Sequence, residues 1–138
     1  MTINDYEKII ELFRTNRGIT VRDADSKESV ERYLQRNSGL NFVAEENQKT
    51  IGCVMCGHDG KRGYLQHMIV LDEFRNRGIG TLLFQKCIDS LKKIGIYKTH
   101  LFVNKTNDLG NQFWKRKGWM LREDIFTYSF NSSTSENA

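Results

Sequence analysis

The sequence lacks any apolar run that could cross a membrane. No uninterrupted apolar stretch approaches the roughly 20 residues that a spanning helix needs. No charged-then-apolar leader precedes Thr2 either. We therefore expect a cytoplasmic protein without a membrane-spanning segment.

Cysteine is scarce, and its pattern suits neither disulfides nor a metal centre. The three cysteines, Cys53, Cys56 and Cys87, are an odd number and lie among apolar residues, as reduced and buried thiols do. In a strand, Cys53 and Cys56 would face opposite ways, and no second cysteine pair exists. The sequence therefore predicts structural thiols and no metal site.

Two common phosphate-binding motifs are also missing. No window contains Gly-x-x-x-x-Gly-Lys followed by Ser or Thr, which excludes a P-loop. A dinucleotide fingerprint needs a third glycine three residues after Gly80, where this chain has Leu83.

What the sequence does contain, near its middle, is a strand that runs directly into a helix. The run Met68–Leu71 is apolar and rich in strand formers, and from Leu83 to Leu91 the apolar residues recur at helical spacing. The first backbone N–H groups of a helix have no partner and lie at the positive end of the helix dipole. Such a junction is suited to bind an anion.

Two glycines and two arginines make this junction suited to a diphosphate. Gly78 and Gly80 remove side chains that would keep a bulky phosphate from the amides, while Arg75 and Arg77 add positive charge. The formal net charge of +4 also favours an anionic partner, either a phosphorylated cofactor or a nucleic acid.

Length and composition predict one globular domain. A chain of 138 residues can bury roughly 70% of its unfolded surface, and its 38% of hydrophobic residues is ordinary for such a domain. We expect the domain to cover residues 1–130. Residues 131–138 have nothing to bury and are expected to form a disordered tail.

The predicted elements follow from hydrophobic period and from turn signals. A change from helical to strand period near Asn41 separates two N-terminal helices from a three-strand meander. The predicted order is a helix capped by Asn4 or Asp5 and ending near Gly18, a helix over 26–37, strands over 41–46, 51–56 and 64–71, the helix after Gly78, a strand over 98–103, a helix over 108–117, and closing strands over 119–121 and 125–130.

Three local motifs in this order resemble the GNAT superfamily of acyl-CoA N-acyltransferases. Arg75–Gly80 resembles the family signature Arg/Gln-x-x-Gly-x-Gly/Ala, which follows a strand. Asn107–Trp119 lines up with the family segment Asn-x-x-Ala-x-x-x-Tyr-x-x-x-Gly-Phe, and Gly57–Gly63 is similar to a hairpin common in one bacterial subgroup.

The resemblance implies an α/β fold of the GNAT type. Its sheet would be mixed and mostly antiparallel, with about six to seven strands and about four helices. The family usually begins with a strand, but only residues 1–3 precede the first helix cap here. The N-terminal strand is therefore expected to be short, missing, or supplied by a partner.

The resemblance also implies that acetyl-CoA is the cofactor. The backbone of Met68, Ile69 and Val70 would pair with its pantetheine arm. Asn107 would contact it from the opposite side of a cleft. The residues expected to bind around the glycine loop are Arg75, Asn76, Arg77, Gly78, Ile79, Gly80 and Thr81.

The resemblance also places residues at the family's catalytic positions. The N–H at or near Val70 would polarise the thioester carbonyl. The family's base positions correspond to Tyr64 and Gln66, which are poor bases but could order a water molecule. His67 is the alternative because its unperturbed pKa is about 6.5. Strand alternation points His67 to the face opposite Gln66, unless a bulge intervenes.

The proton donor is the clearest departure from the family pattern. Many members have a Tyr where this chain has Trp114, and its hydroxyl protonates the leaving thiolate. An indole N–H cannot act as a practical acid. The donor is therefore unassigned, with water, Tyr97 and Tyr128 as candidates.

The resemblance implies an N-acetyltransferase in which an amine attacks the thioester directly. Two other functions stay open: a catalytically silent acyl-CoA sensor, favoured by Trp114 and the poor bases, and a basic nucleic-acid module, favoured only by net charge. We expect a small-molecule or peptide amine as substrate, with no nucleic-acid or membrane partner. The sequence leaves open the acceptor and whether the chain forms a homodimer.

Overall fold

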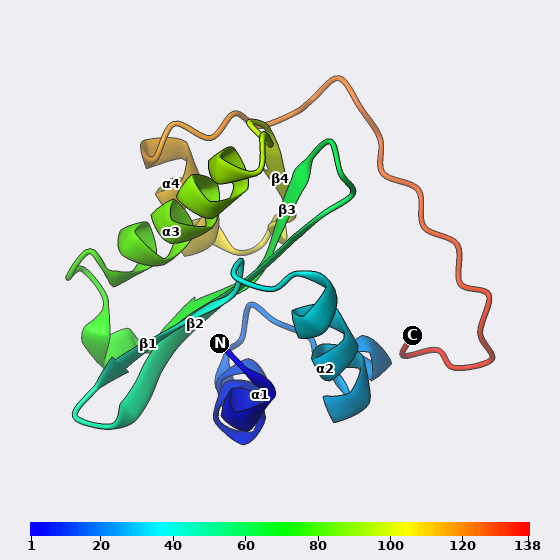
Figure 1. The fold of residues 1–138 in the computed structure, drawn as a ribbon. Helices are drawn as coiled ribbons and strands as arrows, with labels where there is room; N and C mark the ends of the chain where they lie inside the picture. The colour runs from blue at the N-terminus through cyan, green and yellow to red at the C-terminus, as the bar shows by residue number, and fades with distance from the viewer. The chain divides into compact units, whose positions relative to one another are not determined.

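The computed structural model describes residues 1–138, which form two compact units, Met1–Leu101 and Phe102–Ala138. All strands lie in the first unit (Figure 1). Its elements are η1 Ile3–Asp5, α1 Tyr6–Thr15, η2 Asp23–Asp25, α2 Lys27–Arg36, β1 Phe42–Glu46, β2 Lys49–His58, β3 Gly63–Val70, η3 Asp72–Phe74, α3 Ile79–Lys93 and β4 Thr99–Leu101. The second unit contains α4, Asp108–Arg116. No helix is long and apolar enough to span a bilayer.

The sheet is mixed, in the order β1-β2-β3-β4. β1 with β2 and β2 with β3 are antiparallel, which confirms the predicted meander, whereas β3 and β4 are parallel. The parallel pairing covers only Gly63 to Leu65 of β3. From Gln66 to Val70, β3 is therefore paired on one side only, with β2.

Strand β3 contains a bulge where it crosses the middle of β2. Ile69 lies opposite Cys53 and Gln66 lies opposite Met55, so two residues of β3, His67 and Met68, face the single residue between them on β2. His67 has a φ of 44°, in the left-handed region that few residues other than glycine adopt. The bulge breaks the simple alternation of side chains along β3.

Helices cover both faces of the sheet (Figure 1). Amphipathic helices α1 and α2 bury apolar residues on one face. Helix α3 packs closely on the other face, so closely that a Cβ on Gly63 of β3 would lie 2.5 Å from Leu91 Cδ1 of α3. The predicted cap of α2 is confirmed, since the Ser26 side chain accepts from the Ser29 amide. The core beneath α1 and α2 consists of Ile9, Ile10, Leu12, Phe13, Val30, Leu34, Cys53, Met55 and Ile69.

The N-terminus has no strand, which confirms the expected departure from the family pattern. Residues 3–5 form the turn η1 instead, in which the Thr2 amide donates to the Asp5 carboxylate at 2.8 Å. The N-terminal ammonium of Met1 donates to the carbonyl of Asn41 at 2.9 Å and so holds the start of the chain near β1.

The second unit corrects the prediction of two closing strands. Residues 119–121 and 125–130 form no strand, so the sheet has four strands rather than six to seven. Strand propensity reflects packing on a pleated, half-buried surface. Phe126, Tyr128 and Phe130 have no such surface, because they are 87%, 90% and 94% exposed. Residues 131–138 have no helix or strand either, and their predicted disorder stays a prediction.

Candidate active site

The glycine loop presents the open N-terminus of α3. This helix begins at Ile79 after Gly78, whose φ of 80° is left-handed, and its first bond runs from the Leu82 amide to the Gly78 carbonyl. The amides of Ile79, Gly80 and Thr81 are thus in the first turn, where they have no partner within the helix. A Cβ at Gly78 would meet nothing within 4 Å, so the backbone conformation alone requires glycine there.

The two arginines of this loop have different roles. Arg75 Nε donates to the carbonyl of Val70 at 3.3 Å, and its guanidinium lies 3.0 Å from Asp72, so it ties the loop to the end of β3. Arg77 is about half exposed and lies 3.8 Å from Glu46 and 5.1 Å from the Phe74 ring centre. Arg77 is therefore the more accessible positive charge beside the first turn of α3.

The end of β3 next to the loop directs a backbone amide to its unpaired edge. The Leu71 amide donates to the Ile51 carbonyl at 2.9 Å, across to the β2 side. Val70 precedes Leu71 and lies opposite Gly52. Val70 and Gly52 are a non-hydrogen-bonded pair of the antiparallel ladder, so the N–H and C=O of Val70 do not bond to β2. Both groups point to the edge where β4 no longer pairs, and Arg75 takes the carbonyl.

One face of β3 carries the polar side chains of Tyr64 and Gln66. Gln66 lies opposite Met55, a member of the core beneath α1 and α2. Tyr64 lies opposite Gly57, where a Cβ would meet Tyr33 of α2. Directly opposite residues of antiparallel strands share a face, so Tyr64 and Gln66 both face these helices. Burial raises the pKa of Tyr64.

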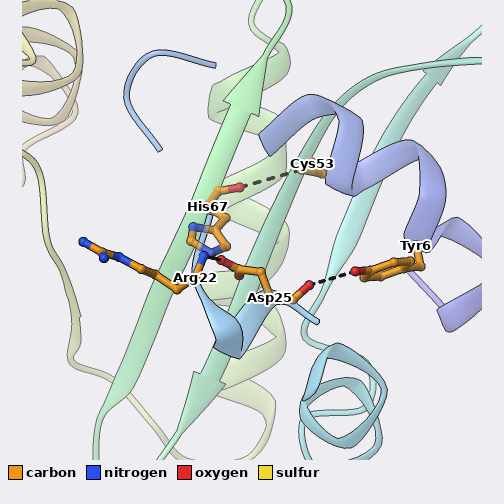
Figure 2. A network of polar contacts seen from close by, with 5 residues as sticks. All are labelled: Tyr6, Arg22, Asp25, Cys53 and His67. Atoms are coloured by element: carbon orange, nitrogen blue, oxygen red, sulfur yellow. Dashed lines mark hydrogen bonds and ion pairs between the residues drawn. The ribbon is translucent and has the colours of Figure 1, made fainter. Parts of the chain in front are cut away.

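His67 lies on this same face, because the bulge intervenes. Its ring centre is 4.5 Å from that of Phe13 on α1. Its Nε2 is 2.8 Å from Asp25 Oδ1 on η2 (Figure 2). Simple alternation would have placed His67 and Gln66 on opposite faces, but the bulge that was named as the exception is present, and both residues lie on one face. The bulge adds one residue to β3 and turns the imidazole toward η2.

Asp25 is a buried carboxylate held by several donors. The residue is 6% exposed, its Oδ2 accepts from the Arg22 amide at 2.8 Å, and its backbone carbonyl accepts from the Tyr6 hydroxyl at 3.0 Å (Figure 2). Burial by itself would raise the pKa of Asp25, but the bonds from His67 and Arg22 outweigh burial and lower that pKa. Asp25 is therefore ionised at neutral pH.

A family model for the Acetyltransferase (GNAT) family matches residues 6–119. The chain belongs to the GNAT acetyltransferase family. The matched residues contain the glycine loop, the bulged strand β3 and helix α4.

Two curated relatives and one solved structure resemble the chain. An acetyltransferase of Pectobacterium atrosepticum is 38% identical over 84 residues, which are 61% of this chain and 60% of that protein. N-alpha-acetyltransferase 30 of Schizosaccharomyces pombe is 30% identical over 99 residues, 68% of this chain and 66% of that protein. The PaiA N-acetyltransferase of Thermoplasma acidophilum, solved with coenzyme A, has a TM-score of 0.75 at 24% identity, with 85% and 84% of the two chains covered. The chain thus spans less than two thirds of these curated relatives' lengths.

The other residues expected from the GNAT resemblance lie in the second unit. The Asn107 side chain accepts from the Gly110 amide at 2.9 Å and thereby caps α4. Trp114 is largely buried, with its ring centre 4.9 Å from that of Trp119 and 5.0 Å from that of Phe113. Within this unit, Asn107 is a helix cap and Trp114 is a packing residue.

Sequence reasoning missed Asp25. It lies 42 residues before His67, in a short turn with no motif of its own. The two residues meet only through the folding of η2 onto β3. The one available signal was the acidic pair Asp23 and Asp25 just before the Ser26 cap, and that pattern is ordinary at the start of a helix.

Proposed function

We propose that this chain is an N-acetyltransferase that moves an acetyl group from acetyl-CoA to an amine. One observation carries the proposal: the Val70 amide lies at the unpaired edge of β3, immediately before the loop that leads into the open first turn of α3. A single extended ligand with an acyl thioester at one end and a diphosphate at the other would use both sets of backbone donors. Acetyl-CoA has this form.

The donor would bind along this edge and loop. Its pantetheine arm would pair with the backbone of Met68, Ile69 and Val70, and its diphosphate would accept from the amides of residues 76–81. Arg77 would add charge, while Arg75 would hold the loop. The coenzyme A complex of the Thermoplasma acidophilum protein supports this choice of donor.

The reaction would be a direct attack of the amine nitrogen on the thioester carbon. Negative charge develops on the carbonyl oxygen, and the Val70 amide is the backbone group proposed to stabilise it. Tyr64 and Gln66, which share the face toward α1 and α2, would order a water molecule near the amine. Trp114 supplies no acid, so water would protonate the thiolate, which is an adequate leaving group with a thiol pKa near 8.5.

The acceptor that we propose is a peptide α-amine. The Schizosaccharomyces pombe relative is an N-alpha-acetyltransferase, which supports this class. A small-molecule amine is the other class to be compared. The two classes are separable by a screen of short peptides with free or blocked N-termini against small amines at equal concentration.

Binding and turnover test the proposal in two steps. Acetyl-CoA at about 100 times its dissociation constant should stabilise the folded chain by about 2.7 kcal/mol and raise its melting temperature by several degrees. ATP at the same concentration should have a smaller effect. Gly78→Asp should abolish the acetyl-CoA shift, because its carboxylate would repel the diphosphate at the first turn of α3.

Gly60→Asp is the matched control for this substitution. Gly60 also has a positive φ and open space around it, but it lies in the β2–β3 hairpin rather than in the glycine loop. It should keep the acetyl-CoA shift. Release of free thiol with any amine would then distinguish an enzyme from a silent acyl-CoA sensor. No shift with acetyl-CoA or CoA would refute the proposed donor.

A further inference from the structure

We infer that His67 is the general base for the acceptor amine and that Asp25 is the positioning residue that fixes its tautomer. The inference rests on the proposed acetyl transfer and names the group that receives the amine proton. It differs from an assignment to Tyr64 or Gln66, because neither of those side chains is a base at neutral pH.

The hydrogen bond to Asp25 decides which ring nitrogen is basic. Asp25 is ionised and can only accept, so the 2.8 Å contact requires a proton on His67 Nε2. In the neutral ring the lone pair is then on Nδ1, for which the structure shows no partner. The imidazole side chain is 22% exposed, so the ring is anchored at Nε2 without being fully enclosed.

The backbone holds this ring where an acceptor would approach. His67 lies in the part of β3 that has no β4 neighbour, three residues before Val70. Its φ of 44° is an uncommon conformation for a residue with a side chain, although histidine is among those that adopt it most. Such strain persists only where surrounding contacts over-determine it, and it often marks a functional site.

The contacts that fix this conformation come from three elements. Phe13 of α1 packs on the ring, Asp25 of η2 binds Nε2, and the Cys53 thiol of β2 lies 3.7 Å from the His67 carbonyl. The ionisable groups around His67 are Asp25 and Arg22 near η2, Tyr6 on α1 and Cys53 on β2 (Figure 2). Asp25 is the one ionisable side chain shown bonded to the imidazole.

His67 Nδ1 removes one proton from the acceptor ammonium and passes it to solvent, which leaves a neutral amine. The nitrogen lone pair forms the C–N bond, and the C–S bond breaks with its electron pair going to sulfur. The remaining excess proton on nitrogen goes to Nδ1 and passes from there through water to the thiolate, which returns the imidazole to its neutral form. The products are the amide, free CoA thiol and one proton in solution.

Replacing the base gives the first test. With an active acceptor, His67→Gln should lower kcat/KM by about 100- to 10,000-fold at neutral pH. The deficit should shrink as pH rises, because solvent then supplies the deprotonated amine. The thermal shift with acetyl-CoA should be unchanged. His58→Gln is the matched control, since His58 is a hairpin histidine bonded to the Gly60 amide, and it should keep full activity.

A spectroscopic test does not depend on turnover. Nitrogen NMR of ¹⁵N-histidine-labelled protein should show His67 as the Nε2–H tautomer. Asp25→Asn should reverse it, because the one amide oxygen accepts from the Arg22 amide and the amide N–H then donates to Nε2. Asp25→Asn should also lower kcat/KM with little change in KM.

The outcomes separate the two proposals. A His67→Gln variant with wild-type kcat/KM, a deficit that does not change with pH, or an Nδ1–H tautomer in the wild type would each overturn the role of His67 while leaving acetyl transfer intact. Loss of the acetyl-CoA shift in the wild type would instead count against the proposed function.

Discussion

The replacement Asp25→Asn measures how much the buried carboxylate contributes to stability. Asp25 accepts one bond from His67 and one from the Arg22 amide, at 2.8 Å each. Both are charge-assisted and worth about 2 kcal/mol each. In the variant, the Asn Oδ1 accepts from the Arg22 amide and its Nδ2–H donates to His67 Nε2, so two neutral bonds of about 1 kcal/mol each replace them. We therefore expect unfolding to be easier by about 2 kcal/mol. For 138 residues this corresponds to a decrease in melting temperature of about 7 °C.

The pH dependence of this difference identifies the carboxylate as its cause. The pKa of Asp25 is below its ordinary value of 3.8 in the folded protein. Its stabilising effect is thus fully present above the unfolded value and is lost as pH falls through the lower folded value. Urea unfolding of wild type and Asp25→Asn should differ by a similar free energy at pH 7 and pH 5, and the two should converge below pH 3.8.

Glu31→Gln is the control for this experiment. It makes the same change from carboxylate to amide on an exposed position of α2, and it should alter the free energy of unfolding by less than about 0.5 kcal/mol. An Asp25→Asn protein as stable as the wild type at pH 7 would refute the reasoning. So would a difference that persists unchanged at acidic pH.

Three further substitutions test other parts of the structure. Gly63→Ala should destabilise by about 1–3 kcal/mol in urea unfolding, because its Cβ would lie 2.5 Å from Leu91 Cδ1. Gly78→Ala should cost about 1–2 kcal/mol by the same assay, because φ is 80° there. Asn107→Ala should lose the bond to the Gly110 amide and weaken α4 by about 1 kcal/mol, seen as faster exchange of that amide.

Each of these substitutions has a comparison that isolates its cause. Gly60→Ala has a similar backbone cost to Gly78→Ala, since its φ is 94°, but only the change at Gly78 should weaken acetyl-CoA binding. Asn107→Asp keeps an acceptor oxygen and should retain the cap. Equal stability of Gly63→Ala and wild type would show that α3 can move away from β3.

The elements of the first unit were predictable because their signals are local. Hydrophobic period, the Ser26 cap and the turn residues at positions 47–48 and 59–60 act over a few residues, and the meander that they predict is confirmed. The glycine loop before α3 was also predictable from the sequence. Two of its residues have a left-handed backbone, Asn76 with a φ of 60° and Gly78 with a φ of 80°, and Asn and Gly are residue types that adopt this conformation most readily.

The position of His67 was not predictable, because it depends on distant contacts. Where a bulge forms is set by the register between β2 and β3 and by what the extra residue can contact. Here that contact is Asp25, 42 residues away. The prediction of closing strands was wrong for a related reason, since residues 125–130 have strand-forming side chains but no partner strand in the structure. Propensity is local, whereas pairing is not.

The bulge links the two halves of the proposed site, and hydrogen exchange can test that link. Pairing with β4 ends at Leu65, just before the bulge, so the irregularity that turns His67 toward Asp25 coincides with the start of the unpaired edge that ends at Val70. The Val70 amide should therefore exchange fast in the free protein. Acetyl-CoA at about 100 times its dissociation constant should slow it up to about 100-fold. The Leu71 amide, bonded to the Ile51 carbonyl, is the internal control and should be protected with or without ligand. If the first turn of α3 became protected while Val70 did not, acetyl-CoA would bind through its diphosphate alone, and the Val70 amide would have no part in acyl transfer.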